Sequence, residues 1–373
     1  MTSETLSFDV LRIVTKGPGD VSGLMGLIAT GKLSAPDIVA VLGKTEGNGG
    51  VNDFTREYAV AALREALAPH LTLEPRKVEE KIAFVMSGGT EGVLSPHLTV
   101  FVRGVSRDEI QTGDVHASSN KRLSIGIAHS RDFLPEEIGR KPQIDETMQA
   151  VHRAMADAGI DDPEDVHFVQ VKCPLLTSER IEAAARRGCN TVTTSGYASM
   201  GYSRGASALG VAAALGECEG IDERQVLKDW DLFSAVASCS AGIELMHNVV
   251  IVMGNAACST SPFVIGHAVM RDSIDISAVL EALRSVGLGS AAAQSDARLV
   301  NVFAKAEASP DGTVRGFRHT MLDDSDVGST RHARAAVGGL IGGLAGTGAV
   351  YVSGGAEHQG PPGGGPVAVI ARV

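Results

Sequence analysis

One succession of expected elements occurs three times in this sequence, and the repetition restricts the fold more than any other feature. In the first hundred residues, strands are expected at 10–16, 37–44, 81–86 and 97–104, with helices at 21–32 and 55–71. The middle and last sections follow the same order, and the middle section adds a helix at 178–188. We therefore predict an α/β protein of three related β-α-β-α-β-β repeats packed about a pseudo-three-fold axis, with units at 1–108, 109–258 and 259–373.

Each repeat offers a lysine, an arginine and a serine in that order. Each lysine ends an apolar strand, and each serine begins a turn of small residues. The three sets are Lys44, Arg56 and Ser87; Lys172, Arg204 and Ser240; and Lys305, Arg334 and Ser353. The spacing within a set differs between repeats, as insertions in surface loops would cause. A strand-end lysine or a glycine turn is ordinary by itself, but the threefold recurrence indicates a shared site.

A lysine beside a serine can make the serine a nucleophile. Desolvation and mutual repulsion both lower the pKa of a lysine, and a neutral amine can then act as a general base. A serine hydroxyl needs such a base, and Ser-Lys pairs are one known arrangement. The small residues after each serine let the backbone approach a ligand, where successive N–H groups can hold an oxyanion.

The three arginines are predicted near helix N-termini, with Thr55 as the N-cap of the first of these helices. The helix dipole mildly disfavours a cation there, which surface arginines tolerate routinely, and the functional alternative is that the arginines bind a ligand. Guanidinium groups can hold carbonyl oxygens, and three of them suit a ring with three carbonyls. An acid also follows each serine by four residues: Glu91, Glu244 and Glu357.

Composition excludes several classes of protein. The net charge of −11 argues against a nucleic-acid partner, and no apolar run approaches the ~18 residues of a membrane span. The N-terminal segment is acidic where a signal peptide needs positive charge, so a cytoplasmic location is expected. The odd number of cysteines, with no C-x-x-C pair, indicates reduced thiols. No organic cofactor is expected, but the loop at 354–366 could bind Mg²⁺ or Ca²⁺ through backbone carbonyls and one carboxylate.

With the repeated Lys, Arg and Ser around "VMSGGTEGVLSPH" and "VSGGAEHQGPPGGG", the sequence resembles the cyanuric acid hydrolase/barbiturase family of ring-opening amidohydrolases over essentially its whole length. The resemblance implies one central active site and a cyclic ureide substrate whose ring is opened by hydrolysis of one C–N bond. Cyanuric acid would give carboxybiuret, then biuret and CO₂. We expect cyanuric acid as the substrate. The alternatives are barbituric acid, hydrolysed to ureidomalonate, and a non-catalytic protein that binds cyclic ureides.

The resemblance also assigns roles to residues. Ser240 would be the nucleophile and Lys172 its base, and Gly242, Ile243 and Glu244 support this register although Ser238 stands two residues away. The expected substrate-binding residues are Lys44, Arg56, Ser87, Gly88, Arg204, Ser240, Ala241, Lys305, Arg334, Ser353 and Gly354. The expected metal ligands are the Glu307 carboxylate and the carbonyls of Ala356, Gln359, Gly360, Pro361 and Gly364. A homo-oligomer, specifically a tetramer, is implied as well.

Overall fold

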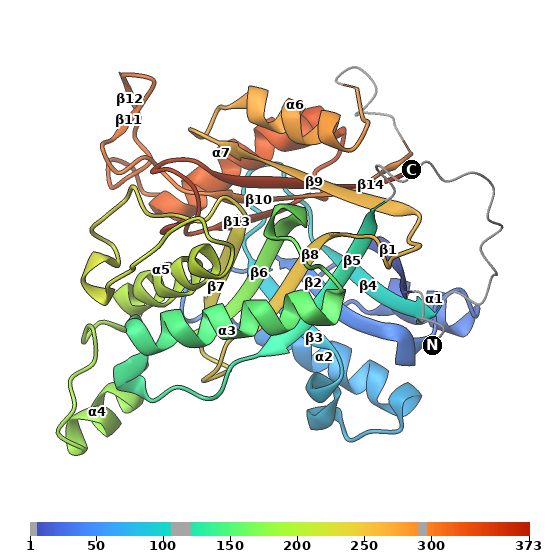
Figure 1. Cartoon of the computed structure of the whole chain (residues 1–373), viewed down its shortest axis with the longest axis horizontal. Helices are drawn as coiled ribbons and strands as arrows, with labels where there is room; N and C mark the ends of the chain where they lie inside the picture. Colours follow the sequence, from blue (N-terminus) through green and yellow to red (C-terminus); the bar gives the residue numbers. More distant parts are fainter. Residues whose placement is uncertain (1–5, 106–120, 290–296) are drawn as a thin grey trace.

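The computed structural model describes residues 6–105, 121–289 and 297–373. Within these residues the chain forms three four-stranded sheets and one two-stranded hairpin. Figure 1 shows the three sheets toward the middle of the molecule and the long helices around the outside. The predicted unit boundary between residues 108 and 109 lies outside the described residues.

Each sheet, with its helices, comes from one repeat. The first repeat contains β1 (Leu6–Val14), α1 (Ser22–Ala29), β2 (Ile38–Thr45), α2 (Phe54–Leu71), β3 (Ala83–Gly88) and β4 (His97–Val105). The second contains β5 (Arg122–His129), α3 (Lys141–Ala158), β6 (Val166–Pro174), α4 (Ser178–Arg186), α5 (Gly196–Ala214), β7 (Ala237–Gly242) and β8 (Val249–Ala256). The third contains β9 (Phe263–Met270), α6 (Ile276–Ser285), β10 (Leu299–Ala306), β11 (Thr313–Val314), β12 (Phe317–Arg318), α7 (Ser329–Ala345), β13 (Tyr351–Gly354) and β14 (Gly365–Arg372). The predicted order β-α-β-α-β-β is confirmed in all three.

The sheets share one topology. Their strand orders are β1-β4-β2-β3, β5-β8-β6-β7 and β9-β14-β10-β13. In each sheet the second and third strands of the repeat are parallel, and the remaining pairs are antiparallel. An irregularity in the register recurs near the start of each second strand, at Ile38/Ala40, Val166/Phe168 and Leu299/Asn301. The repeats therefore agree in local backbone detail as well as in element order.

The apolar core explains why the sheets meet at the centre. One cluster combines buried side chains from all three sheets, including Phe8, Phe101, Phe168, Phe303 and Tyr351. Three further clusters fill the space between each sheet and the helices of its own repeat. A sheet covered on both faces needs nearly continuous apolar strands, which is the pattern that the sequence shows. No helix of the described residues is long and apolar enough to span a membrane.

The N-cap of α2 lies two residues earlier than predicted. Asp53 is the N-cap, and its side chain accepts a hydrogen bond from the Thr55 backbone N–H at 3.0 Å. Thr55, predicted as the cap, lies inside the first turn. Its hydroxyl donates to the same carboxylate at 2.5 Å, so the two residues form one capping arrangement.

The start of α5 was predicted too late in the chain. The helix begins at Gly196 behind Ser195, whose side chain accepts from the Ala198 N–H at 3.2 Å. Arg204 therefore lies in the middle of the helix, and Arg334 lies in the second turn of α7. The dipole argument made for these two arginines is wrong, because the dipole effect falls off within the first turn. The segment 196–201 has a glycine at each end and carries little helix signal of its own, and the N-cap supplies it instead.

A hairpin that the sequence analysis did not predict follows the polar loop after β10. Its strands, β11 and β12, are joined by Arg315 and Gly316, both with positive φ (53° and 82°). Two consecutive residues of positive φ define the type I′ turn that suits a two-residue hairpin.

Candidate active site

Parallel pairing within each sheet sets the lysine of a repeat opposite the serine of the same repeat. The Cα partners are Lys44 and Ser87, Lys172 and Ser240, and Lys305 and Ser353. Parallel strands end at the same edge of a sheet, so a residue at the end of one strand lies beside the end of its neighbour. The register that joins each lysine to its serine thus follows directly from the repeat topology.

Three such edges converge on one narrow cavity. Nine of the eleven predicted substrate-binding residues line it: Arg56, Ser87, Gly88, Arg204, Ser240, Ala241, Arg334, Ser353 and Gly354. The other two, Lys44 and Lys305, lie behind the serines and contact them through hydrogen bonds. Gly49, Met86 and Met200 also line the cavity and were not predicted. Met86 lies in an apolar strand and Met200 lies in a helix, and nothing in the sequence around either residue indicates that it faces a ligand.

Lys44 and Lys305 have equivalent surroundings. Lys44 Nζ donates to Ser87 Oγ (3.1 Å) and to the Val352 carbonyl (2.7 Å), which belongs to the third repeat. Lys305 Nζ donates to Ser353 Oγ (3.2 Å) and to the Cys239 carbonyl (2.6 Å) of the second repeat. Burial lowers the pKa of both amines, and that of Lys305 falls to about 7. A neutral amine is therefore within reach near neutral pH.

Lys172 differs from the other two lysines. Its Nζ lies 2.7 Å from Glu244 Oε1, and it makes no hydrogen bond to Ser240 within the described part of the chain. Burial lowers the pKa of Lys172, while the Glu244 carboxylate raises it and Arg56 lowers it. Ser240 Oγ lies instead 3.2 Å from Ser353 Oγ. Catalytic hydrogen bonds often tighten only when substrate binds, so this geometry is compatible with Lys172 as a base.

Two of the arginines bind an acid of the next repeat through paired contacts. Arg204 donates to both carboxylate oxygens of Glu357 at 2.8 and 2.5 Å, and Arg334 donates to both of Glu91 at 2.9 and 2.7 Å. Such forks fix the plane of the guanidinium. Arg56 instead donates to the Ala241 carbonyl at 3.0 Å. All three arginines therefore reach across repeat boundaries at the cavity.

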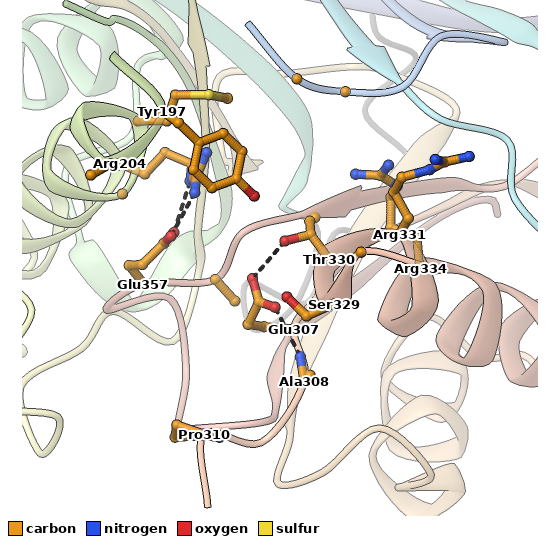
Figure 2. A pocket seen from close by; sticks show the side chains of 18 of the residues that line it. Tyr197, Arg204, Glu307, Ala308, Pro310, Ser329, Thr330, Arg331, Arg334 and Glu357 are labelled. Carbon is orange, nitrogen blue, oxygen red and sulfur yellow. Dashed lines mark hydrogen bonds and ion pairs between the residues drawn. The ribbon is translucent and has the colours of Figure 1, made fainter. Parts of the chain in front are cut away.

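The narrow cavity adjoins a wider one of about 860 Å³, and the two share lining residues that include Arg204 and Arg334. In Figure 2, Glu307 lies between two pairs of residues. Arg204 and Glu357 are on one side of it, and Arg331 and Arg334 are on the other. The aromatic residues Tyr197 and Trp230 also line this space. They lie in a helix start and a loop, and no motif in the sequence marks them as site residues.

Glu307 fits the carboxylate of a hard-cation site. Burial and the nearby Glu357 raise the pKa of Glu307. Its oxygens accept from the Ala308 N–H (3.0 Å) and, at 3.5 Å, from the Thr330 hydroxyl. A buried acid with these weak neutral donors is a suitable ligand for a cation.

The predicted carbonyl ligands divide into two groups. Ala356 and Gly360 line the same cavity as Glu307, whereas Gln359, Pro361 and Gly364 are not among the described residues lining it. The Ala356 carbonyl accepts from Gln359 N–H at 3.0 Å, and the Pro361 carbonyl accepts from Gly364 N–H at 2.9 Å. The described residues contain no cluster of three or more His, Cys, Asp or Glu side chains that could hold a metal. One carboxylate with backbone carbonyls is nevertheless the donor set of Mg²⁺ and Ca²⁺.

Comparison with known proteins agrees with this fold and gives the family. The family model described as "Amidohydrolase ring-opening protein" matches residues 9–372. A cyanuric acid amidohydrolase of Bradyrhizobium diazoefficiens is 70% identical over 371 residues, covering 99% of each chain. Another, from Pseudomonas sp. (strain ADP), is 61% identical and covers 98% of this chain and 99% of its own. A solved structure of a cyanuric acid hydrolase superposes with a TM-score of 0.93 at 59% identity, covering 99% of this chain and all of that one.

The fold of three repeats and the central cavity thus define a ring-opening amidohydrolase. The chain belongs to this family, as the resemblance of its Lys-Arg-Ser repeats indicated.

Proposed function

We propose that this protein hydrolyses cyanuric acid, opening the ring to carboxybiuret, which loses CO₂ to give biuret. The observation that carries the proposal is the convergence of three serines and three arginines on one narrow cavity. Cyanuric acid has three carbonyls and three N–H groups in threefold arrangement, so each edge of the ring can meet one repeat. The names of the relatives described above support the same substrate.

The proposed reaction uses the corner at Ser240. Ser240 Oγ attacks a ring carbonyl carbon while Lys172 takes the hydroxyl proton, and N–H groups of the turns after the serines stabilise the oxyanion. The C–N bond of the ring then breaks, and Lys172 returns the proton to the leaving nitrogen. Water hydrolyses the acyl-enzyme, which releases carboxybiuret and restores the serine. The arginines hold the remaining carbonyl oxygens and keep the ring in place.

The substrate is tested by assaying the purified protein with cyanuric acid and with barbituric acid. We expect release of biuret and CO₂ from cyanuric acid, and little or no ureidomalonate from barbituric acid, because barbituric acid has CH₂ where one corner would meet an N–H. Faster turnover of barbituric acid would make the enzyme a barbiturase. Saturable binding of cyanuric acid without ring opening over hours would show a binding protein instead.

We also propose that Glu307 and carbonyls of the glycine-rich loop, Ala356 and Gly360 first among them, hold a structural Mg²⁺ or Ca²⁺. A ligand present at about 100 times its Kd stabilises a folded protein by ~2.7 kcal/mol. Saturating cation should therefore raise the Tm of chelator-treated protein by several degrees. Glu307→Gln should abolish this rise in Tm. The control is Glu91→Gln, which alters a carboxylate held by Arg334 and should show the same rise as the natural protein. An equal rise in both variants would contradict the site.

The proposed tetramer and cytoplasmic location rest on the family resemblance and on composition. Light scattering during size-exclusion chromatography would give the mass of the assembly, for comparison with the 38.6 kDa chain. Cell fractionation would test the location.

A further inference from the structure

The three acids that follow the serines do not have equivalent partners. Glu91 and Glu357 each bind the arginine of the preceding repeat, through Arg334 and Arg204. By the same rule, Glu244 would pair with Arg56. Glu244 instead contacts Lys172 at 2.7 Å. The threefold pattern is therefore broken at the repeat that carries Ser240.

The reason for the break is visible beside Arg56. Asp53, three residues earlier on α2, lies 3.6 Å from Arg56 Nε, and its side chain is fully buried. The positions three residues before Arg204 and Arg334 hold Gly201 and Arg331, neither of which is an acid. Asp53 thus supplies a negative charge to Arg56 within its own repeat. This releases Glu244 to pair with the lysine.

Glu244 also differs in its access to solvent. Its side chain is 34% exposed, against 12% for Glu91 and 18% for Glu357, while the Lys172 side chain is 1% exposed. Lys172 is thus a buried amine in contact with a carboxylate that reaches water. Lys44 and Lys305 contact hydroxyl and carbonyl oxygens, which cannot accept a proton near neutral pH.

We propose that Glu244 is the positioning residue that makes Lys172, among the three lysines, the working base. It holds the amine in place and exchanges protons between the amine and solvent. Before Ser240 reacts, the Lys172 ammonium gives one proton to Glu244, and Lys172 is left as a neutral amine. Glu244 then releases the proton to water. This inference rests on the proposed function, in which Lys172 takes the serine proton.

The charges around the pair fix the sign of the expected pH effect. Burial lowers the pKa of Lys172, the Glu244 carboxylate raises it, Arg56 lowers it further, and Cys173, next in the chain, raises it. Arg56 and Arg180 are further cations that interact with Glu244. Glu244→Gln removes the carboxylate, which raises the pKa more than Cys173 does, so the Lys172 pKa must fall. A base that must be neutral then becomes active at lower pH.

The test is a pH profile of kcat and kcat/KM for the natural protein, Glu244→Gln and Glu91→Gln. In Glu244→Gln we expect kcat to fall about tenfold or more, since orienting groups behind a catalytic base contribute at least this much. We also expect KM to change little and the acid limb to move to lower pH. Glu91→Gln, which releases Arg334, should raise KM and leave the acid limb in place. Formate should partly restore kcat to Glu244→Ala, because the site is open to solvent.

A second measurement separates failure of this inference from failure of the proposed function. The Lys172 pKa can be followed by NMR of ¹³Cε-labelled lysine, with Lys172→Met to assign the signal. A lower pKa in Glu244→Gln supports the inference whichever ring the enzyme opens. An unchanged pKa and an unmoved acid limb would overturn it, even with full activity on cyanuric acid. Unimpaired turnover in Ser240→Ala would overturn the proposed nucleophile instead.

Discussion

Replacing Ser240 by alanine is expected to lower kcat for cyanuric acid at least about 10³-fold, because loss of a nucleophile removes the covalent route altogether. The fold should persist, since the change removes one hydroxyl that contacts Ser353 at the cavity. The measurement is steady-state biuret release, with Tm as a check on folding. A labelled acyl-enzyme, trapped by mass spectrometry after rapid quench, should be present in the natural protein and absent from the variant.

Ser87→Ala is the matched control, since Ser87 is the equivalent serine of the first repeat and contacts Lys44. It loses a hydrogen bond to the ring but no reacting atom. We expect about a tenfold loss in kcat/KM, the size of one such bond. If Ser87→Ala proved as inactive as Ser240→Ala, the assignment of one reactive corner would not hold.

Lys172→Met is expected to lower kcat by about 10² to 10⁴, the usual contribution of a general base. The Tm should stay the same or rise, because methionine fills the volume of a fully buried amine without its desolvation cost, and Glu244 remains free to be solvated. Loss of activity without loss of stability would separate a catalytic lysine from a structural one. Kinetics and thermal unfolding are measured on the same preparation.

Lys305→Met tests the other possible route for the proton. Ser240 Oγ lies 3.2 Å from Ser353 Oγ, and Lys305 donates to Ser353 at 3.2 Å. We expect this variant to bind cyanuric acid less tightly but to keep the acid limb of its pH profile. If Lys305→Met is inactive while Lys172→Met keeps most of its kcat, the proton leaves Ser240 through Ser353 to Lys305.

The break in threefold symmetry offers a physical reason for the single reactive corner that we propose. In a symmetric site, three equivalent lysines would surround a symmetric ring, and any of the three serines could react. In the second repeat, Glu244 contacts Lys172, and Arg56, its expected partner, lies beside Asp53 instead. This exchange of partners makes the second repeat different from the other two. In our proposal this exchange depends on Asp53, which belongs to the first repeat, whereas the serine that it affects, Ser240, belongs to the second.

The sequence by itself determined the repeat order and the Lys-Arg-Ser series, whereas the register that sets each lysine opposite its serine came from the structure. The repeat order and the series follow from local signals: apolar strands, glycine turns and the parallel arrangement that the β-α-β order requires. The local signals failed at the start of α5, where glycines at 196 and 201 weaken the helix signal, and Arg204 lies in the middle of that helix.

Only the tertiary structure decided which acid meets which cation. Arg204 and Glu357 are 153 residues apart, and Arg334 and Glu91 are 243 apart. Contacts between repeats depend on how three sheets pack around the axis, and no period or spacing in the chain records that packing. The sequence shows Glu91, Glu244 and Glu357 at the same distance from their serines and so presents them as equivalent. The fold makes them different, because a buried charge pairs with the nearest opposite charge in space, whatever its place in the sequence.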